Sequence, residues 1–304
     1  MKVTEKIERA NANGRYFWSF EYFPPKTESG AVNLFERMER MKSLGPEFID
    51  VTWGAGGSSS EETIKCVTTS QVAIGLETSM HLTCTNMPLE KLDWALERCK
   101  EIGIRNILAL RGDAPRGVET WTASEGGFSN AIDLVKYIRE KHGDWFCIGV
   151  AGYPEGHIEN NDKEAEFAHF IQKAKLADYV VTQLFYEPDL FLSWYNRVRA
   201  AGIEIPILPG IMPIQTYAGF QRLIGREKTF VPAEVLAALE AVKDDDFAVR
   251  EYGVKLAVEM CEKLKAGGHK GFHFYTMNLE KSVRQILQGV GFVSAAVATA
   301  NTEE

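Results

Sequence analysis

The sequence has few cysteines, and they are not arranged to build a disulfide framework or a metal site. Five cysteines are spread over 304 residues, none of them forms a Cys-x-x-Cys pair, and their number is odd. Disulfide-dependent secreted domains carry an even and closely spaced set, so that class is excluded. The first residues also lack the apolar core of a secretion signal. We therefore expect reduced thiols and a cytoplasmic location.

Long apolar runs and clusters of basic residues are missing as well. No stretch approaches the ~20 apolar residues that a membrane-spanning helix needs. The net charge is -8 and the lysines and arginines are scattered, so neither nucleic acid nor an anionic membrane is an expected partner. The sequence contains 45% hydrophobic residues and 11% aromatic residues. This content is enough for a sizeable core in one large domain or two ordinary ones.

Strand-like and helix-like segments alternate at intervals of roughly 30 residues, the size of a βα unit. Segments rich in β-branched and aromatic residues predict strands at residues 17–23, 48–53, 78–84, 106–112, 146–152, 179–185, 205–209 and 271–276. Apolar residues at helical spacing predict helices between them, among them 31–44, 88–102, 128–142, 163–176, 189–200 and a long helix ending near residue 265.

This alternation favours an α/β fold with a single (β/α)8 TIM barrel over residues 1–292. The alternative is a doubly wound open sheet, but no Gly-x-Gly-x-x-Gly follows the first strand. Residues 294–304 contain one valine and no other bulky apolar residue. We therefore expect residues 293–304 to be a flexible tail or a severed linker.

The stretch Arg111-Gly112-Asp113 ends the fourth predicted strand with a pair of opposite charges. Residues i and i+2 of a strand share one face, so Arg111 and Asp113 are expected to point the same way. Gly112 permits close approach of a ligand or an unusual backbone angle. A structural ion pair is the alternative, and an adhesion signal is discounted because no other feature is typical of an extracellular protein.

Polar residues recur at the carboxyl ends of the predicted strands, where barrel enzymes form their active sites. The residues at these ends are Glu21, Thr52, His81, Arg111, Asp113, Tyr153, Gln183 and Tyr275. Paired carboxylates also suit glycoside hydrolysis, but the strand ends show few aromatic platforms for a sugar. No His, Asp and Glu set resembles a metal triad, so no metal site is expected. The pattern indicates an enzyme.

The motifs at these ends, taken in order, resemble those of the methylenetetrahydrofolate reductase family over about residues 16–292. The motifs are Phe20-Glu21-Tyr22-Phe23-Pro24-Pro25-Lys26, Asp50-Val51-Thr52-Trp53, His81-Leu82-Thr83-Cys84, Leu110-Arg111-Gly112-Asp113, Ala151-Gly152-Tyr153-Pro154-Glu155-Gly156-His157, Thr182-Gln183-Leu184-Phe185, Pro209-Gly210-Ile211-Met212-Pro213 and His273-Phe274-Tyr275-Thr276-Met277-Asn278. The resemblance implies that FAD is reduced by NADPH or NADH, which leaves before 5,10-methylenetetrahydrofolate is reduced to 5-methyltetrahydrofolate. The sequence does not separate NADH from NADPH, and a homo-oligomer is a possible assembly.

The resemblance also implies roles for individual residues. Glu21 would be the general acid that protonates N10 of the substrate, in an apolar setting supplied by the neighbouring aromatic residues Phe20, Tyr22 and Phe23. The alternative for Glu21 is an ion pair with Lys26 or Arg111. Asp113 would lie near the flavin and the pterin and stabilise the cationic iminium. The residues expected to contact the folate are Glu21, Gln183, Tyr275 and Tyr217.

The FAD contacts implied by the resemblance come from the strand ends and from two helices. They are Thr52, Trp53, His81, Arg111, Gly112, Asp113, Asn130, Ala131, Tyr153, His157, Glu166 and Lys173. For Lys173 the alternative is a solvated helix face. Leu279 stands where many relatives have arginine, which affects one expected folate contact.

Three rival classes make different predictions. Another flavin barrel, such as a proline dehydrogenase, would bind FAD without turning over folate. A pterin-binding methyltransferase barrel would bind folate and be colourless. A catalytically dead subunit would not need intact Glu21, Asp113 and Gln183.

Long members of the family append a regulatory domain that binds S-adenosylmethionine.

Overall fold

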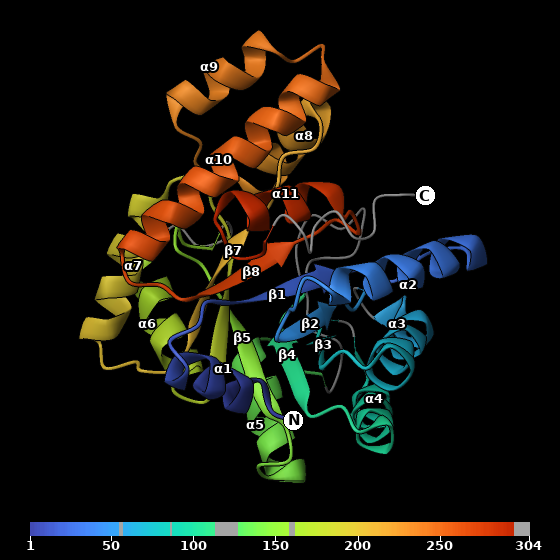
Figure 1. The fold of residues 1–304 in the computed structure, drawn as a ribbon. Coiled ribbons are helices and arrows are strands. Elements are labelled where there is room, and N and C mark those ends of the chain that lie inside the picture. The colour runs from blue at the N-terminus through green and yellow to red at the C-terminus, as the bar shows by residue number, and fades with distance from the viewer. Residues whose placement is uncertain (55–56, 86, 113–126, 158–161, 295–304) are drawn as a thin grey trace.

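The computed structural model describes residues 1–54, 57–85, 87–112, 127–157 and 162–294. Its strands are β1 (Phe17–Tyr22), β2 (Phe48–Val51), β3 (Thr78–Thr83), β4 (Asn106–Leu110), β5 (Cys147–Gly152), β6 (Tyr179–Leu184), β7 (Ile207–Ile211) and β8 (Gly271–Tyr275). Within the described residues, these eight strands pair in chain order, all parallel, and β8 pairs with β1 to close a barrel (Figure 1). The predicted (β/α)8 barrel is confirmed, and the open-sheet alternative is wrong.

Helices surround the barrel, and the helices predicted from the sequence follow in the expected order. They are α1 (Val3–Ala12), α2 (Glu28–Lys42), α3 (Ser60–Thr68), α4 (Leu89–Ile102), α5 (Ala131–His142), α6 (Lys163–Ala174), α7 (Pro188–Ala200), α8 (Tyr217–Glu227), α9 (Ala233–Ala241), α10 (Asp246–Ala266) and α11 (Lys281–Gly289). Several begin at a side-chain cap: Thr27, Asn130, Asp162, Thr216 and Asp245 each accept a bond from a first-turn amide. A π-helical segment, Thr69–Ile74, continues α3.

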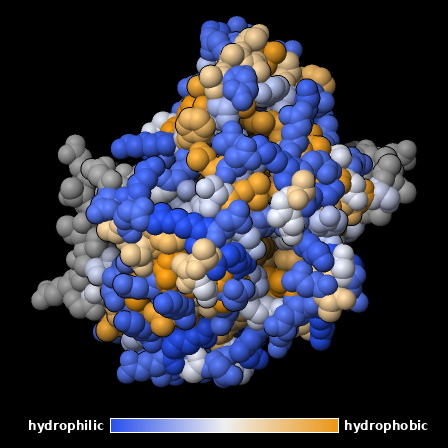
Figure 2. Space-filling model, turned by 90° about the vertical axis from the view of Figure 1, so that its left-hand side faces the viewer, coloured by the Kyte–Doolittle hydropathy of each residue, from blue (hydrophilic) through white to orange (hydrophobic). Residues whose placement is uncertain are grey.

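The amino-terminal helix α1 closes one end of the barrel. Val3, Ile7 and Ala10 are buried in a cluster with Phe48 of β2 and Tyr179 of β6. Since these residues fill the end at which the strands begin, the opposite end, formed by the carboxyl ends of the strands, is left for a binding site. On the face shown in Figure 2, hydrophilic residues predominate and hydrophobic residues lie in scattered groups.

Two elements differ from the sequence prediction. The seventh strand was expected to end at Pro209, which cannot donate to a strand ladder. It runs on to Ile211 because the pairing with β6 shifts between Val181 and Leu184, so Pro209 falls at an irregularity of the ladder. Helix α11 was not predicted, although its buried Val283, Ile286 and Leu287 have helical spacing.

Candidate active site

Glu21 lies at the carboxyl end of β1 and points into the barrel. One of its carboxylate oxygens, Oε2, lies 3.6 Å from Nε2 of His81 and 3.7 Å from Nε2 of His273. Burial raises the pKa of Glu21, and the nearby His81 lowers it in part. A carboxyl group in this setting retains its proton at higher pH than a solvated one, as a general acid requires.

A second carboxyl group, Asp50 of β2, lies beside Glu21 and is completely buried. Its Oδ1 is 3.9 Å from Nε2 of His81, and its Oδ2 is 3.7 Å from Nδ1 of His273. The pKa of Asp50 is raised to about 7, chiefly by burial and to a smaller extent by Glu21, although His273 and the Ser79 hydroxyl lower it in part. Burial also lowers the pKa of each imidazole to about 4, so both histidines are neutral near pH 7.

The environment of Glu21 differs from the expected one. Phe20 and Tyr22 are adjacent in sequence and therefore point to the other face of β1, where Phe20 packs near Phe274 and the Tyr22 hydroxyl donates to the sulfur of Met41. Phe23 is 41% exposed. The expectation that these aromatic residues bury Glu21 is wrong, because the buried groups that face it are the histidines inside the barrel.

Arg111 and Gly112 follow β4, which ends at Leu110 rather than at Gly112. Gly112 has φ +89°, and a Cβ there would lie 2.8 Å from Cβ of Thr83. The glycine is therefore required by both backbone angle and space, as the sequence suggested. The Thr85 hydroxyl donates to the carbonyl oxygen of Arg111 at 2.5 Å. Asp113 lies outside the described residues, so its expected orientation beside Arg111 is untested.

Many of the expected FAD contacts line a cavity of about 370 Å³ between the ends of β4 and β5 and helices α5 and α6. Those lining it are Arg111, Asn130, Ala131, Tyr153, His157, Glu166 and Lys173, together with His169, which the sequence did not single out. Lys173 is 6% exposed, so the solvated-face alternative is wrong. Its Nζ lies 5.2 Å from the centroid of the Tyr153 ring.

The ionisable groups of this cavity are held in unfavourable surroundings. Burial lowers the pKa of Lys173 to about 8, against the opposing effect of Glu166. Burial raises the pKa of Glu166, against the opposing effect of Lys173. Because the pKa of Glu166 is raised, Glu166 is a weak counter-ion for the buried Lys173. An anionic ligand in the cavity would therefore stabilise the charged form of Lys173.

The other expected cofactor contacts lie at the ends of β2 and β3. Trp53 and His81 are buried. The amide of Thr52 donates to the carbonyl of Tyr22, and the carbonyl of Thr52 accepts a bond from the Thr63 hydroxyl, which anchors the end of β2 to α3. These residues therefore sit on the side of the barrel mouth that also holds Glu21.

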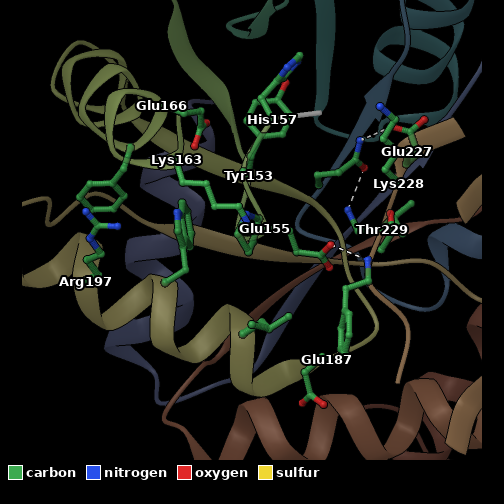
Figure 3. Close-up of a pocket in the computed structure, with 18 of the residues that line it drawn as sticks. Tyr153, Glu155, His157, Lys163, Glu166, Glu187, Arg197, Glu227, Lys228 and Thr229 are labelled. Carbon is green, nitrogen blue, oxygen red and sulfur yellow. Dashed lines mark hydrogen bonds between the residues drawn. The ribbon is translucent and has the colours of Figure 1, made fainter. Parts of the chain in front are cut away.

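A larger cavity of about 1200 Å³ adjoins the first, and both are lined by Arg111, Tyr153, His157 and Glu166. Figure 3 shows Glu227 and Lys228 on a different side of it from Tyr153. Gln183 of β6 lines it too, and its Nε2 donates to a carboxylate oxygen of Glu227 at 3.2 Å. Its Oε1 accepts from the amide of Leu184 at 2.9 Å. Glu227 comes from the last turn of α8, and no sequence motif indicated it.

The two expected folate-binding tyrosines are placed differently. The Tyr275 ring lies 4.9 Å from the His273 ring, and its hydroxyl donates to the carbonyl oxygen of Thr182 at 2.7 Å. It therefore spans the strand ends at the barrel mouth. The hydroxyl of Tyr217 is bonded to Glu240 of α9, and Tyr217 does not line either cavity described above.

The structure is a (β/α)8 barrel whose carboxyl end carries an acid of raised pKa, Glu21, and a cavity lined by Arg111 and Lys173 at the ends of β4 and β5. Comparison with known proteins identifies the family. A profile described as "Methylenetetrahydrofolate reductase" matches residues 6–291. The chain belongs to the methylenetetrahydrofolate reductase family, as its motifs suggested.

The relatives include plant, fungal and bacterial proteins. The chain is 52% identical over 303 residues to a "Probable methylenetetrahydrofolate reductase (NADH)" of Oryza sativa subsp. japonica, covering 96% of this chain and 51% of the relative. It is 50% identical over 295 residues to "Methylenetetrahydrofolate reductase 2" of Saccharomyces cerevisiae, covering 95% of this chain and 49% of the relative. It thus spans about half the length of these relatives. It is 34% identical over 272 residues to "5,10-methylenetetrahydrofolate reductase" of Pectobacterium carotovorum, covering 88% of both.

A solved structure supports the fold alone. An "Uncharacterized protein from Clostridium thermocellum" that "binds two copies of 5-methyl-5,6,7,8-tetrahydrofolic acid" aligns with TM-score 0.61 at 13% identity, over 96% of this chain and 97% of that one. In the part of the chain that the structure describes, no helix is both long and apolar enough to cross a membrane.

Proposed function

We propose that this chain catalyses the FAD-dependent reduction of 5,10-methylenetetrahydrofolate to 5-methyltetrahydrofolate in the cytoplasm, with NADH or NADPH as reductant, and so supplies methyl groups for methionine synthesis. The observation that carries the proposal is Glu21, an acid of raised pKa at the barrel mouth of a member of this family. The two substrates would use the same face in turn, in a ping-pong sequence.

The residues of the smaller cavity fit FAD. A dinucleotide brings a diphosphate that needs cationic and N–H donors, and flat rings that pack on aromatic side chains. Lys173 and His157 supply such donors, Tyr153 supplies an aromatic face, and Asn130 caps the start of α5. The low pKa of Lys173 fits this role, because a bound diphosphate would stabilise its charged form. When bound, FAD would take hydride from the nicotinamide and deliver it to the folate.

The chain's own contribution to the folate step would be proton transfer and binding. Glu21 would donate its proton to N10 of the folate as the bond between N10 and the methylene carbon breaks, which leaves Glu21 as a carboxylate. Gln183 would hydrogen-bond the pterin, and Tyr275 would line the same space. Asp113, which follows Arg111 and Gly112, would stabilise the positive charge of the opened iminium.

The test is an absorbance spectrum of the purified protein between 300 and 550 nm. We expect flavin bands that bleach after anaerobic addition of NADH or NADPH and return after methylenetetrahydrofolate is added. Comparing the bleaching rates with the two nucleotides would identify the reductant. Protein that is colourless and cannot be reconstituted with FAD would refute the proposed function, and bands that bleach but do not return with folate would indicate another flavin barrel.

A further inference from the structure

Glu21 and three other titratable side chains, from four consecutive strands of the closed barrel, meet inside the barrel. Glu21 of β1 pairs in register with Asp50 of β2, and β8 and β3 contribute His273 and His81. The contacts between these carboxyl and imidazole groups measure 3.6 to 3.9 Å. Among the described residues, both oxygens of Asp50 and Nε2 of each histidine lack a hydrogen bond of normal geometry. Groups so deeply buried usually have such partners, so the arrangement calls for a functional explanation.

His273 is placed between the two acids. Its Nε2 faces Glu21 at 3.7 Å, and its Nδ1 faces Asp50, also at 3.7 Å. The hydroxyl of Ser19 lies 2.8 Å from Nδ1. If Ser19 donates this bond, the neutral ring carries its proton on Nε2, directed at Glu21. Each 3.7 Å contact becomes a hydrogen bond after a movement of about 1 Å, or through one bridging water.

We propose that Asp50 and His273 hold a proton in reserve beneath Glu21 and deliver it to Glu21 during folate reduction. This inference rests on the proposed function, in which Glu21 is the acid. Asp50 and His273 are positioning residues here, because they act on the folate only through Glu21.

The proposed relay consists of three proton transfers. Glu21 gives its proton to N10 of the folate and becomes a carboxylate. Nε2 of His273 then gives its proton to Glu21. The Ser19 hydroxyl turns away from Nδ1, and Asp50 gives its proton to Nδ1 in its place, so the imidazole stays neutral and Asp50 carries the negative charge. A proton from solvent returns by the reverse route, through Glu21, after the product leaves.

The groups around Glu21 and Asp50 favour a state in which these two carboxyls share one proton. Among the described residues, the titratable groups facing the two carboxyls are His81 on β3, Tyr179 on β6, and His273 and Tyr275 on β8. Burial keeps both histidines neutral and raises the pKa of both tyrosines, so these groups add no charge near neutral pH. Glu21 and Asp50 are register partners beside neutral histidines, and two neighbouring carboxyls resist losing both protons, so the remaining proton belongs to the pair.

The experiment is stopped-flow measurement of both half-reactions on FAD-loaded enzyme between pH 6 and pH 9. The variants are Asp50→Asn, which removes the reserve, and His273→Gln, which keeps both carboxyls but cannot pass a proton between them. We expect reoxidation of the reduced flavin by methylenetetrahydrofolate to fall about tenfold at pH 8 in each variant and to recover towards the wild-type rate at pH 6. Reduction of the flavin by NADH or NADPH should be unchanged. Should Asp50→Asn fail to fold, His273→Gln carries the test.

Asp178→Asn is the matched control. Asp178 bonds Arg139 and the amide of Ile148, before β6 begins and so away from Glu21. Its pH profile should match that of the wild type. Wild-type pH profiles in both test variants would overturn the proposal, and so would an equal loss in both half-reactions at every pH, which indicates a structural role. If the wild-type enzyme itself fails to reduce folate, the proposed function fails instead.

Discussion

Replacing Lys173 with methionine should have opposite effects on FAD binding and on the stability of the FAD-free protein. Methionine has a similar length and carries no charge. A charge-assisted hydrogen bond to a phosphate contributes about 1.5–3 kcal/mol, so Lys173→Met should weaken FAD binding about ten- to hundredfold. Fluorescence titration of the FAD-free protein with FAD measures this directly.

The stability effect follows from the pKa of Lys173, which burial lowers from its ordinary 10.5 to about 8. Holding the lysine charged in the folded protein then costs about 3 kcal/mol below pH 8. The folded state binds fewer protons than the unfolded state between pH 8 and 10.5, so Lys173 makes the FAD-free protein gain stability as the pH rises through that window. Lys173→Met should remove this pH dependence and raise stability at pH 7 by less than 3 kcal/mol, because Glu166 loses its cation.

Urea denaturation of the FAD-free protein at pH 7 and at pH 9.5 measures the stability effect. Lys175→Met is the control, since Lys175 is exposed just after α6 and should affect neither property. Unchanged FAD affinity in Lys173→Met would refute the assignment of Lys173 to the diphosphate. Lower stability at pH 7 would refute the claim that its charge is held at a cost.

Three further substitutions test separate parts of the site and the fold. Glu21→Gln should keep flavin reduction by NADH or NADPH and slow folate reduction ~10²-fold or more, and an equal loss in both half-reactions would exclude the acid role. Glu227→Ala should free the amide of Gln183 and raise the KM for folate about fivefold at unchanged KM for the nicotinamide, as steady-state kinetics would show. Gly210→Ala places a Cβ 2.3 Å from a carbonyl oxygen of β6 and should cost ~2 kcal/mol or more in urea denaturation, whereas Gly225→Ala, with no atom within 4 Å, should not destabilise the protein.

The fold was predictable because each unit of the barrel repeats the same local signal. Strand alternation puts Asp50 on the same face of its strand as Thr52, and His273 on the same face as Tyr275, since residues two apart share a side. The same alternation turns Phe20 and Tyr22 away from the Glu21 carboxyl. The expectation that they surround it was based on proximity in sequence and did not take this alternation into account. Adjacent residues in a strand lie on opposite faces, so proximity in sequence was the wrong criterion.

The contacts between strands were not predictable from the sequence. The meeting of Asp50 with His273 depends on barrel closure, which brings β8 against β1, and on a register that no local pattern encodes. The bond from Gln183 to Glu227 depends on the position of the last turn of α8, which follows a loop and is set by packing. Such contacts join residues 44 or more positions apart.

The distribution of charge around the barrel mouth explains how the proposed proton donor and the proposed phosphate site can coexist. Glu21 and Asp50 lie on the side formed by β1, β2, β3 and β8, among neutral histidines. Lys173 lies beside β4 and β5, with Glu166 as its opposing charge. A lysine ammonium next to Glu21 would favour the carboxylate and lower its pKa, which would remove the acid at neutral pH. Their separation around the barrel therefore allows burial to raise the pKa of Glu21 and to lower that of Lys173, as the proposed proton donor and the proposed diphosphate contact each require.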